Sequence, residues 1–276
     1  MNELSTAAVI GLGLVGGSVA RDLARQGVRV LGHDSNPASL RQAQEAGAVH
    51  ALLGPGFAGV EEADVVILAV PVKTAAELLR ALAPRLQSAL LVTDTGSTKR
   101  SAVAAAEAAG LGARFVGAHP LAGDHRAGFA ASREGLLLNA RVYLCPAPSA
   151  TPAALRAARG FWSGLGATPL ELEPDDHDLR LAWSSHLPQL ISSLLGSVLA
   201  EAGVAPRELG PGGRSVTRLA ASDRELWSQI CLDNADHLEP ALRLVEERLR
   251  AVRQALAEGD QPAVRRLFGQ ASAWKG

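Results

Sequence analysis

The feature that most restricts the fold is a glycine-rich turn close to the N-terminus. The turn reads Gly11-Leu12-Gly13-Leu14-Val15-Gly16; it follows a compact apolar segment, residues 7–11, and opens a helical pattern over residues 14–26. In this arrangement the first glycine makes the bend, the second lets the backbone approach a pyrophosphate, and the third lets helix and strand pack closely. The N–H groups at the helix start then face the anion. The sequence therefore predicts a dinucleotide-binding turn, with a purely structural glycine turn as the alternative.

Strand-like and helical segments alternate through the first 170 residues. The expected strands are residues 7–11, 29–34, 49–53, 64–70, 90–94, 115–120, 142–145 and 169–172. The expected helices are residues 14–26, 37–46, 74–86, 101–109 and 152–165. This alternation predicts an α/β fold with a Rossmann-type, doubly wound, mostly parallel sheet, and we expect residues 1–173 to form this dinucleotide-binding domain.

The pattern changes near Glu173, after which only helical periodicity is seen. It covers residues 175–201, 215–221, 225–258 and 261–274 of the 276. We therefore expect an all-α C-terminal domain over residues 174–276. Its long helices are rich in Leu and Val, so their apolar faces either pair with a second subunit or pack internally.

Composition narrows the expected partners and location. The chain has 27 Lys and Arg against 28 Asp and Glu, a net charge of −1, which gives no overall attraction to nucleic acid or to an anionic membrane. We expect no signal peptide and no transmembrane helix, since no apolar run approaches ~18 residues. Cys145 and Cys231 form no CxxC pair or disulfide framework, so we expect a reducing, cytoplasmic location.

Two further features fit a bound dinucleotide. Asp34 ends the second expected strand, where a carboxylate accepts hydrogen bonds from ribose hydroxyls and repels a 2′-phosphate, so NAD is favoured over NADP. An acid at a helix N-terminus with no ligand is the alternative. Ala69, Val70 and Pro71 end the strand over residues 64–70, at the edge that borders the ligand crevice, although Pro71 alone is equally typical of a strand terminator.

Polar side chains follow two neighbouring strands. Ser97 lies in the segment DTGSTK, residues 94–99, and His119 opens the segment HPLAG, residues 119–123. Both are expected at the carboxyl edge of the sheet, where an imidazole can accept a proton from a substrate hydroxyl. Ser97 is also a candidate N-cap for a helix that starts near Thr98.

The helical part adds a second group of candidates. His186 lies in the segment WSSHLP, residues 183–188, where Pro188 should disturb the helix. Arg214 and Arg218 are candidates to bind a carboxylate in a bidentate manner. The remaining histidines are poorer candidates, and they show no metal-binding spacing, so no metal site is expected: His33, His50, His177 and His237.

Together these motifs resemble the prephenate/arogenate dehydrogenases of tyrosine biosynthesis. The matching segments are VIGLGLVGGSVA (9–20), TDTGSTK (93–99), FVGAHPLAG (115–123), SSHLPQLIS (184–192) and GRSVTRLAASDRELWSQICLDN (213–234). The resemblance implies NAD-dependent oxidative decarboxylation. Hydride leaves the ring carbon that bears the 4-hydroxyl, the ring carboxylate leaves as carbon dioxide, and aromatisation drives the reaction. It also implies a homodimer built through the helical part.

The resemblance implies roles residue by residue. His119 matches the catalytic histidine that hydrogen-bonds the 4-hydroxyl, Ser97 the serine beside it, and His186 the histidine of the SHLP segment. Arg218 matches the arginine that binds a substrate carboxylate.

Three positions depart from the family pattern: Asp124, Gln189 and Arg214. They surround the substrate and bear on the choice between prephenate and arogenate. Asp124 has a charge that suits the ammonium of arogenate.

Two other readings stay open. A β-hydroxyacid or imine-type dehydrogenase of similar architecture would place a catalytic Lys on a C-terminal-domain helix, whereas Lys73, Lys99 and Lys275 lie elsewhere. A non-catalytic NAD-sensing protein would need the glycine turn and Asp34 but not the polar set around His119.

Overall fold

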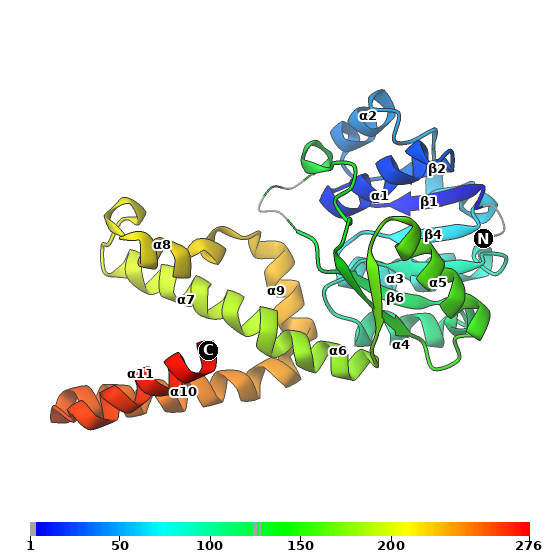
Figure 1. Cartoon of the computed structure of the whole chain (residues 1–276). Coiled ribbons are helices and arrows are strands. Elements are labelled where there is room, and N and C mark those ends of the chain that lie inside the picture. The colour runs from blue at the N-terminus through cyan, green and yellow to red at the C-terminus, as the bar shows by residue number, and fades with distance from the viewer. Residues whose placement is uncertain (1–3, 124–125, 127) are drawn as a thin grey trace.

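The computed structural model describes residues 4–123, 126 and 128–276. Its first part contains a five-stranded parallel sheet in the order β3-β2-β1-β4-β5, which confirms the predicted doubly wound fold (Figure 1). The strands are β1 (Thr6–Ile10), β2 (Arg29–His33), β3 (Ala51–Leu52), β4 (Val65–Leu68) and β5 (Leu91–Asp94).

Helices cover both faces of this sheet because alternate residues of a strand point to opposite sides. In β1, Ala7 and Val9 face one apolar core, and Ala8 and Ile10 face the other. The first core includes side chains of α1 (Leu14–Arg25), α2 (Pro37–Glu45) and α5 (Pro152–Gly164), and the second includes those of α3 (Val72–Leu82) and α4 (Arg100–Ala108).

A second sheet of three strands continues beyond β5. It contains β6 (Val116–Pro120), β7 (Arg141–Pro146) and β8 (Thr168–Glu171). β7 runs antiparallel to β6, because a loop and not a crossover helix joins the two strands, and it runs parallel to β8. A parallel bridge between Val92 and Phe115 connects the sheets. β6 therefore runs in the direction of β5, and the carboxyl ends of β1, β4, β5 and β6 share one edge.

The rest of the chain is helical, as predicted, but three expected helices are interrupted. The elements are α6 (Pro174–Leu181), α7 (Leu187–Glu201), α8 (Pro211–Val216), α9 (Arg224–Asp233), α10 (Ala235–Glu258) and α11 (Gln261–Lys275). Residues 182–186 form a π-turn before α7, because Pro188 has no N–H for the helix ladder. Asn234 separates α9 from α10, and the helix expected over 215–221 is instead the end of α8 followed by a 3-10 turn, Arg218–Ala221.

The C-terminal helices bury few apolar side chains within this chain. Six hydrophobic residues are buried among the described positions after 173: Leu181, Ala182, Ile230, Leu238, Ala241 and Ala255. Large side chains remain exposed, including Leu194, Val198, Leu249, Leu256, Phe268 and Trp274. Figure 1 shows α7 and the α10–α11 hairpin extending from the first domain as separate arms. Internal packing, one of the two expected outcomes, therefore does not cover these faces.

We propose the domain division that the sequence suggests, residues 1–173 and 174–276. β8 ends at Glu171 and α6 begins at Pro174. Even so, α6 packs against α4 and β7 of the first domain, which brings its side chains close to the strands that carry the polar candidates. None of the helices in the described ranges combines the length and apolarity needed to cross a membrane.

Candidate active site

The glycine turn leaves open space at one of its three glycines. Gly11 has φ +95°, and a Cβ there would lie 2.1 Å from the carbonyl oxygen of Ala69. A Cβ on Gly16 would lie 1.9 Å from the carbonyl oxygen of Gly11, so the fold itself requires both glycines. A Cβ on Gly13 would meet no atom within 4 Å. Gly13 is also the N-cap of α1 and has no side-chain cap, so the turn fits a pyrophosphate at the helix N-terminus.

Asp34 lies directly beside this turn. Its carboxylate accepts hydrogen bonds from the N–H of Leu12 at 2.6 Å and of Asn36 at 2.7 Å. The N-cap of α2 is Asn36, whose side chain accepts from Ala38, so capping that helix does not account for the acid. Two N–H donors leave carboxylate lone pairs for further donors. The position fits recognition of a ribose hydroxyl next to the turn.

The carboxyl end of β4 forms the other wall of the turn. The N–H of Ala69 bonds to the carbonyl of Ile10 at 2.7 Å, and Val70 is within 2.9 Å of a Cβ built on Gly11. Pro71 is the N-cap of α3. Ala69 and Val70 therefore lie where the sequence predicts them, and their contact with a cofactor stays a proposal.

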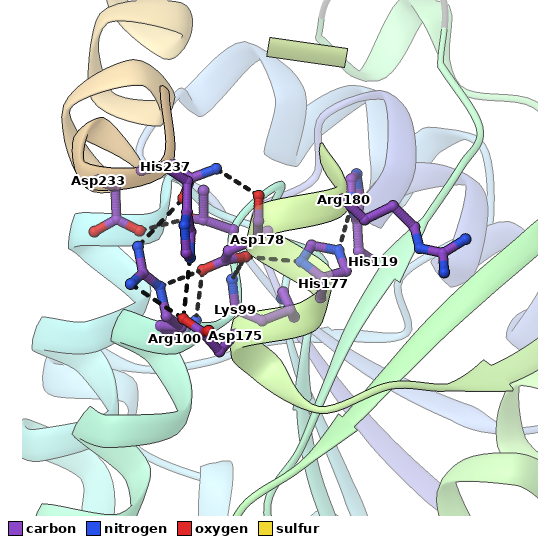
Figure 2. A network of polar contacts seen from close by, with 12 residues as sticks. Lys99, Arg100, His119, Asp175, His177, Asp178, Arg180, Asp233 and His237 are labelled. Atoms are coloured by element: carbon purple, nitrogen blue, oxygen red, sulfur yellow. Dashed lines mark hydrogen bonds and ion pairs between the residues drawn. The ribbon is translucent and has the colours of Figure 1, made fainter. Parts of the chain in front are cut away.

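A chain of hydrogen bonds leads inward from His119, which lies at the end of β6 (Figure 2). His119 Nδ1 lies 3.0 Å from His177 Nε2, and His177 Nδ1 lies 2.8 Å from Asp178 Oδ1. His177 and Asp178 are on α6 and are fully buried, whereas His119 keeps a partly exposed side chain. Two domains thus contribute to one polar array at the edge of the sheet.

His119 is held neutral. Burial is the main cause that lowers the pKa of His119 well below 6.5. Positive charge on His177, Lys99 and His186 lowers this pKa further. Burial also lowers the pKa of His177, and the hydrogen bond to Asp178 opposes that change. A neutral imidazole has one nitrogen available as an acceptor, which is the form that takes up a proton.

Asp178 also caps helix α4 across the domain boundary. Its carboxylate accepts from the N–H of Lys99 at 2.8 Å and of Arg100 at 3.0 Å, and so caps α4 from another helix. Burial raises the pKa of Asp178, but the hydrogen bonds from His177, Arg100 and Lys99 outweigh it, and the pKa lies below its ordinary value. Asp178 is therefore a fixed anion behind the two histidines.

A buried ion pair anchors the strand that carries His119. Lys99 Nζ pairs with Asp94 and also donates to the carbonyl of Ala118 at 2.7 Å. Asp94 accepts from the N–H of Ala118 at 3.0 Å. Both side chains are 0% exposed. Because backbone pairing between β5 and β6 is confined to one bridge, these side chains supply polar contacts that join the strands beside His119.

His186 presents a buried donor with no partner. Its Nδ1 lies 3.1 Å from Nδ2 of Asn234, which also donates to the carbonyl of Asp178 at 2.8 Å. His186 Nε2 is buried and has no hydrogen-bond partner in the part of the chain that is described. Burial lowers the pKa of His186 to about 4, so the ring is neutral at neutral pH. Because Asn234 Nδ2 only donates, His186 Nδ1 is the acceptor and Nε2 carries the proton. An orphaned buried N–H beside a π-turn is typical of a ligand contact.

Ser97 does not cap a helix. The N-cap of α4 is Lys99, so the expected start near Thr98 is wrong, because Asp178 takes the first free N–H groups. Ser97 is half-buried, and no described residue hydrogen-bonds its side chain. Its place beside the substrate stays a prediction.

The two candidate arginines lie in the part of the C-terminal domain that is far from the first domain. Arg214 lies in the last turn of α8, and Arg218 begins the 3-10 turn that follows this helix; both are exposed. They line a groove of about 540 Å³ formed by α7 and by residues of the segment 204–221. Figure 1 shows α8 at the end of α7 that points away from the first domain. Within one chain, therefore, the structure does not bring these arginines to His119.

The remaining predicted residues have different outcomes. Gln189 is 4% exposed, and its amide contacts Leu219 and Ser222, so it holds the turn that carries Arg218 against α7. Its contact with a substrate stays a prediction. Asp124 lies outside the described residues. The described residues contain no group of three or more His, Cys, Asp or Glu side chains arranged to hold a metal ion.

Sequence reasoning missed His177, Asp178, Lys99 and Asn234. His177 was set aside because it has no metal-binding spacing, yet its role here is a hydrogen bond. One signal was present: the chain uses 27 Lys and Arg, of which only three are Lys. A Lys in such a chain marks a place that suits a compact ammonium better than a guanidinium, and Lys99 is such a place.

Comparison with known proteins places these features in a family. A model described as the prephenate dehydrogenase nucleotide-binding domain matches residues 19–170, and one described as the prephenate dehydrogenase dimerization domain matches residues 173–270. The prephenate dehydrogenase of Bacillus subtilis is 32% identical over 97% of this chain and 74% of its own length.

Two solved structures share the fold over nearly the whole chain. The prephenate dehydrogenase from A. aeolicus, in complex with hydroxyphenyl propionate and NAD+, has a TM-score of 0.88 and 29% identity, with 99% of this chain and 98% of that chain covered. The Synechocystis arogenate dehydrogenase has a TM-score of 0.80 and 27% identity, with 98% of each chain covered.

Proposed function

This chain belongs to the prephenate dehydrogenase family and is an oxidoreductase, and from that premise we propose that it catalyses the NAD-dependent oxidative decarboxylation of prephenate, arogenate or both. Prephenate would yield 4-hydroxyphenylpyruvate, and arogenate would yield tyrosine. The observation that carries the proposal is His119, a neutral imidazole at the carboxyl edge of the sheet whose Nε2 has no hydrogen-bond partner among the described residues.

The side chains support a simple proton cycle. Bound NAD supplies the hydride acceptor. His119 Nε2 accepts the proton of the 4-hydroxyl as hydride leaves the same carbon, so a ring carbonyl forms. Loss of carbon dioxide leaves an aromatic phenolate, and His119 returns its proton to the phenolate oxygen. One imidazole thus serves both steps, and no net proton is consumed.

The other candidates hold the substrate. The orphaned Nε2–H of His186 is positioned as a donor for a substrate oxygen, since leaving such a group unpaired costs about 1–3 kcal/mol. Arg218 is exposed and has no ion-pair partner among the described residues, but one chain holds it away from His119, so its binding of a substrate carboxylate stays a proposal from the family resemblance. Ser97 completes the proposed set next to His119.

We also propose a homodimer built through the helical domain. The family model for residues 173–270 is described as a dimerization domain. The exposed apolar side chains of α7, α10 and α11 support this assembly, since contiguous apolar faces of this kind mark interaction surfaces. Location in the cytoplasm stays a prediction.

The alternative enzyme class is disfavoured by Lys99. That lysine is buried, is paired with Asp94 and lies in the first domain, so it is not free to act as a catalytic amine. A non-catalytic NAD-binding protein would leave the buried donor of His186 and the acceptor of His119 without a purpose.

The test is a turnover assay of the full chain with prephenate and arogenate, each with NAD and NADP. We expect reduction of NAD with at least one substrate, together with carbon dioxide release in equal amount. The ratio of the two kcat/KM values decides substrate preference, which we expect to lie slightly toward arogenate because of Asp124. Binding of NAD without turnover of either substrate would support the NAD-sensing alternative instead.

Cofactor choice gives a separate prediction. Asp34→Ser combined with Ser35→Arg should raise the ratio of kcat/KM for NADP over NAD by about 10–100-fold, the scale of one charge-assisted hydrogen bond. The serine at position 34 keeps an oxygen for the N–H of Leu12. Ser35→Arg alone is the control, because Asp34 still repels the 2′-phosphate. If the unaltered enzyme already prefers NADP, the role of Asp34 is wrong.

A further inference from the structure

We propose that His177 and Asp178 are positioning residues that fix His119 in the tautomer whose Nε2 accepts the substrate proton. The proposal rests on the proposed function of His119. It adds a role for two residues of the helical domain that touch neither substrate nor cofactor.

The tautomers follow from the hydrogen-bond chain itself. The carboxylate of Asp178 only accepts, so His177 Nδ1 must donate to it across 2.8 Å. The ring of His177 is then neutral with Nε2 as its acceptor. His119 Nδ1 must therefore donate to that nitrogen across 3.0 Å. His119 Nε2 is left without a proton, and it is the nitrogen of His119 that no described residue hydrogen-bonds.

Asp178 cannot turn away from this arrangement. Its Oδ1 also accepts from the N–H of Lys99, and its Oδ2 accepts from the N–H of Arg100 at 3.0 Å. Both donors belong to the start of α4, so the carboxylate is fixed by backbone groups of the first domain. Reversing the chain would turn the unprotonated Nδ1 of His177 toward the carboxylate, where two acceptors would face each other, and it would leave the buried anion with one donor fewer.

The surroundings offer His177 no other partner. The residue is 0% exposed, and the ring of Tyr143 on β7 contacts it edge-on with centroids 5.5 Å apart. The charged or titratable groups that face His119 are His177, Lys99 and His186, and those that face His177 include Asp178, Lys99 and Asp94. Of the two anions, Asp178 hydrogen-bonds the nitrogen of His177 that faces away from His119, whereas Asp94 is paired with Lys99.

The same chain accounts for the reversible proton transfer. When the O–H bond of the substrate breaks, the new N–H bond forms at His119 Nε2, while Nδ1–H stays bonded to His177. The charge on His119 is then stabilised through His177 by the fixed carboxylate, without moving a proton to Asp178. The proton returns by the same path once the phenolate forms.

The experiment compares two variants of the full-length protein, His177→Gln and His177→Leu. Gln can accept from His119 Nδ1 with its carbonyl and donate to Asp178 with its amide, whereas Leu can do neither. We expect His177→Leu to lower kcat by about 10²–10³-fold, within the range for a displaced acid–base group, with NAD affinity nearly unchanged. His177→Gln should recover at least about tenfold of that loss, since it restores both hydrogen bonds. His50→Gln, a histidine change at the distant β2–β3 edge, is the matched control.

A second measurement does not depend on turnover. Nitrogen-15 NMR of the imidazole rings in the free protein, assigned with a His119→Asn sample, should show His119 protonated at Nδ1 and His177 protonated at Nδ1. In His177→Leu, the His119 ring should become a mixture of tautomers. His119 protonated at Nε2 in the unaltered protein would overturn the proposal, as would a His177→Leu enzyme with full kcat. If neither substrate is turned over, the function proposed above fails, and the NMR result still decides the tautomer.

Discussion

Replacing His119 with Asn is expected to lower kcat by about 10²–10⁴-fold, the usual effect of removing an acid–base group. Asn keeps the approximate size of the ring and a donor for His177, but it has no basic nitrogen for the substrate proton. NAD affinity should be almost unchanged, because the glycine turn follows β1 and Asp34 follows β2, whereas His119 lies on β6. Steady-state kinetics together with NAD titration checks both parts. Near-normal turnover would remove His119 from the mechanism.

The pH profile tests the same residue independently. The active form of His119 is neutral, and its pKa lies well below 6.5 because of burial and the charges around it. Activity should therefore stay constant as the pH falls to 6.5 and decline only below it, as the ring becomes protonated. The measurement is kcat/KM as a function of pH. A separate check at each pH shows whether the enzyme is still folded. An acidic limb centred above pH 6.5 would contradict a neutral His119.

Lys99→Met is expected to destabilise the protein by about 3–5 kcal/mol, because it leaves the carboxylate of Asp94 buried without a counter-charge. Both groups are 0% exposed, so water cannot replace the lost ammonium. The change also removes the donor to the carbonyl of Ala118 and loosens β6 next to His119. The effect is measured as the free energy of unfolding in urea.

Two further variants make that measurement decisive. Lys275→Met removes an exposed lysine at the end of the chain and should change stability by less than about 0.5 kcal/mol. Lys99→Met combined with Asp94→Asn should be more stable than Lys99→Met alone, because no charge is then buried unpaired. A loss below about 1 kcal/mol for Lys99→Met would show that the ion pair is not what holds β6 in place.

The segment after β5 joins the two domains as well as supporting the site. Thr98 and Ser101 donate to Asp233 at 2.6 and 2.8 Å, and Arg100 pairs with Asp236 at the start of α10. Lys99 and Arg100 also receive the cap from Asp178. One short stretch of the first domain therefore positions both α6 and the α9–α10 junction. This explains how the helical domain holds its histidines at a fixed place beside the sheet.

The features that depend on the local order of residues could be predicted before the structure was known. The glycine turn, Asp34 and the end of β4 follow from strand–turn–helix spacing, and parallel strands place their carboxyl ends on one edge. His119 could be assigned to that edge for the same reason. The interruption of the helix near Pro188 could also be predicted, because a proline without an N–H removes a hydrogen bond within one helical turn.

The groups that support His119 could be identified only from the way the two domains pack together. His177 and Asp178 lie 58 or more residues further along the chain, on a helix of the other domain, and no local pattern records that α6 packs beside β6. The sequence likewise could not show that Lys99 holds β6 in place, since the carbonyl to which it donates is on a different strand. Arg218 shows the reverse case: its motif matches, yet it lies in the turn that follows α8, and Figure 1 shows α8 at the end of α7 that points away from the first domain. Hydrogen bonds are short-ranged, so such pairings exist only once the domains are docked.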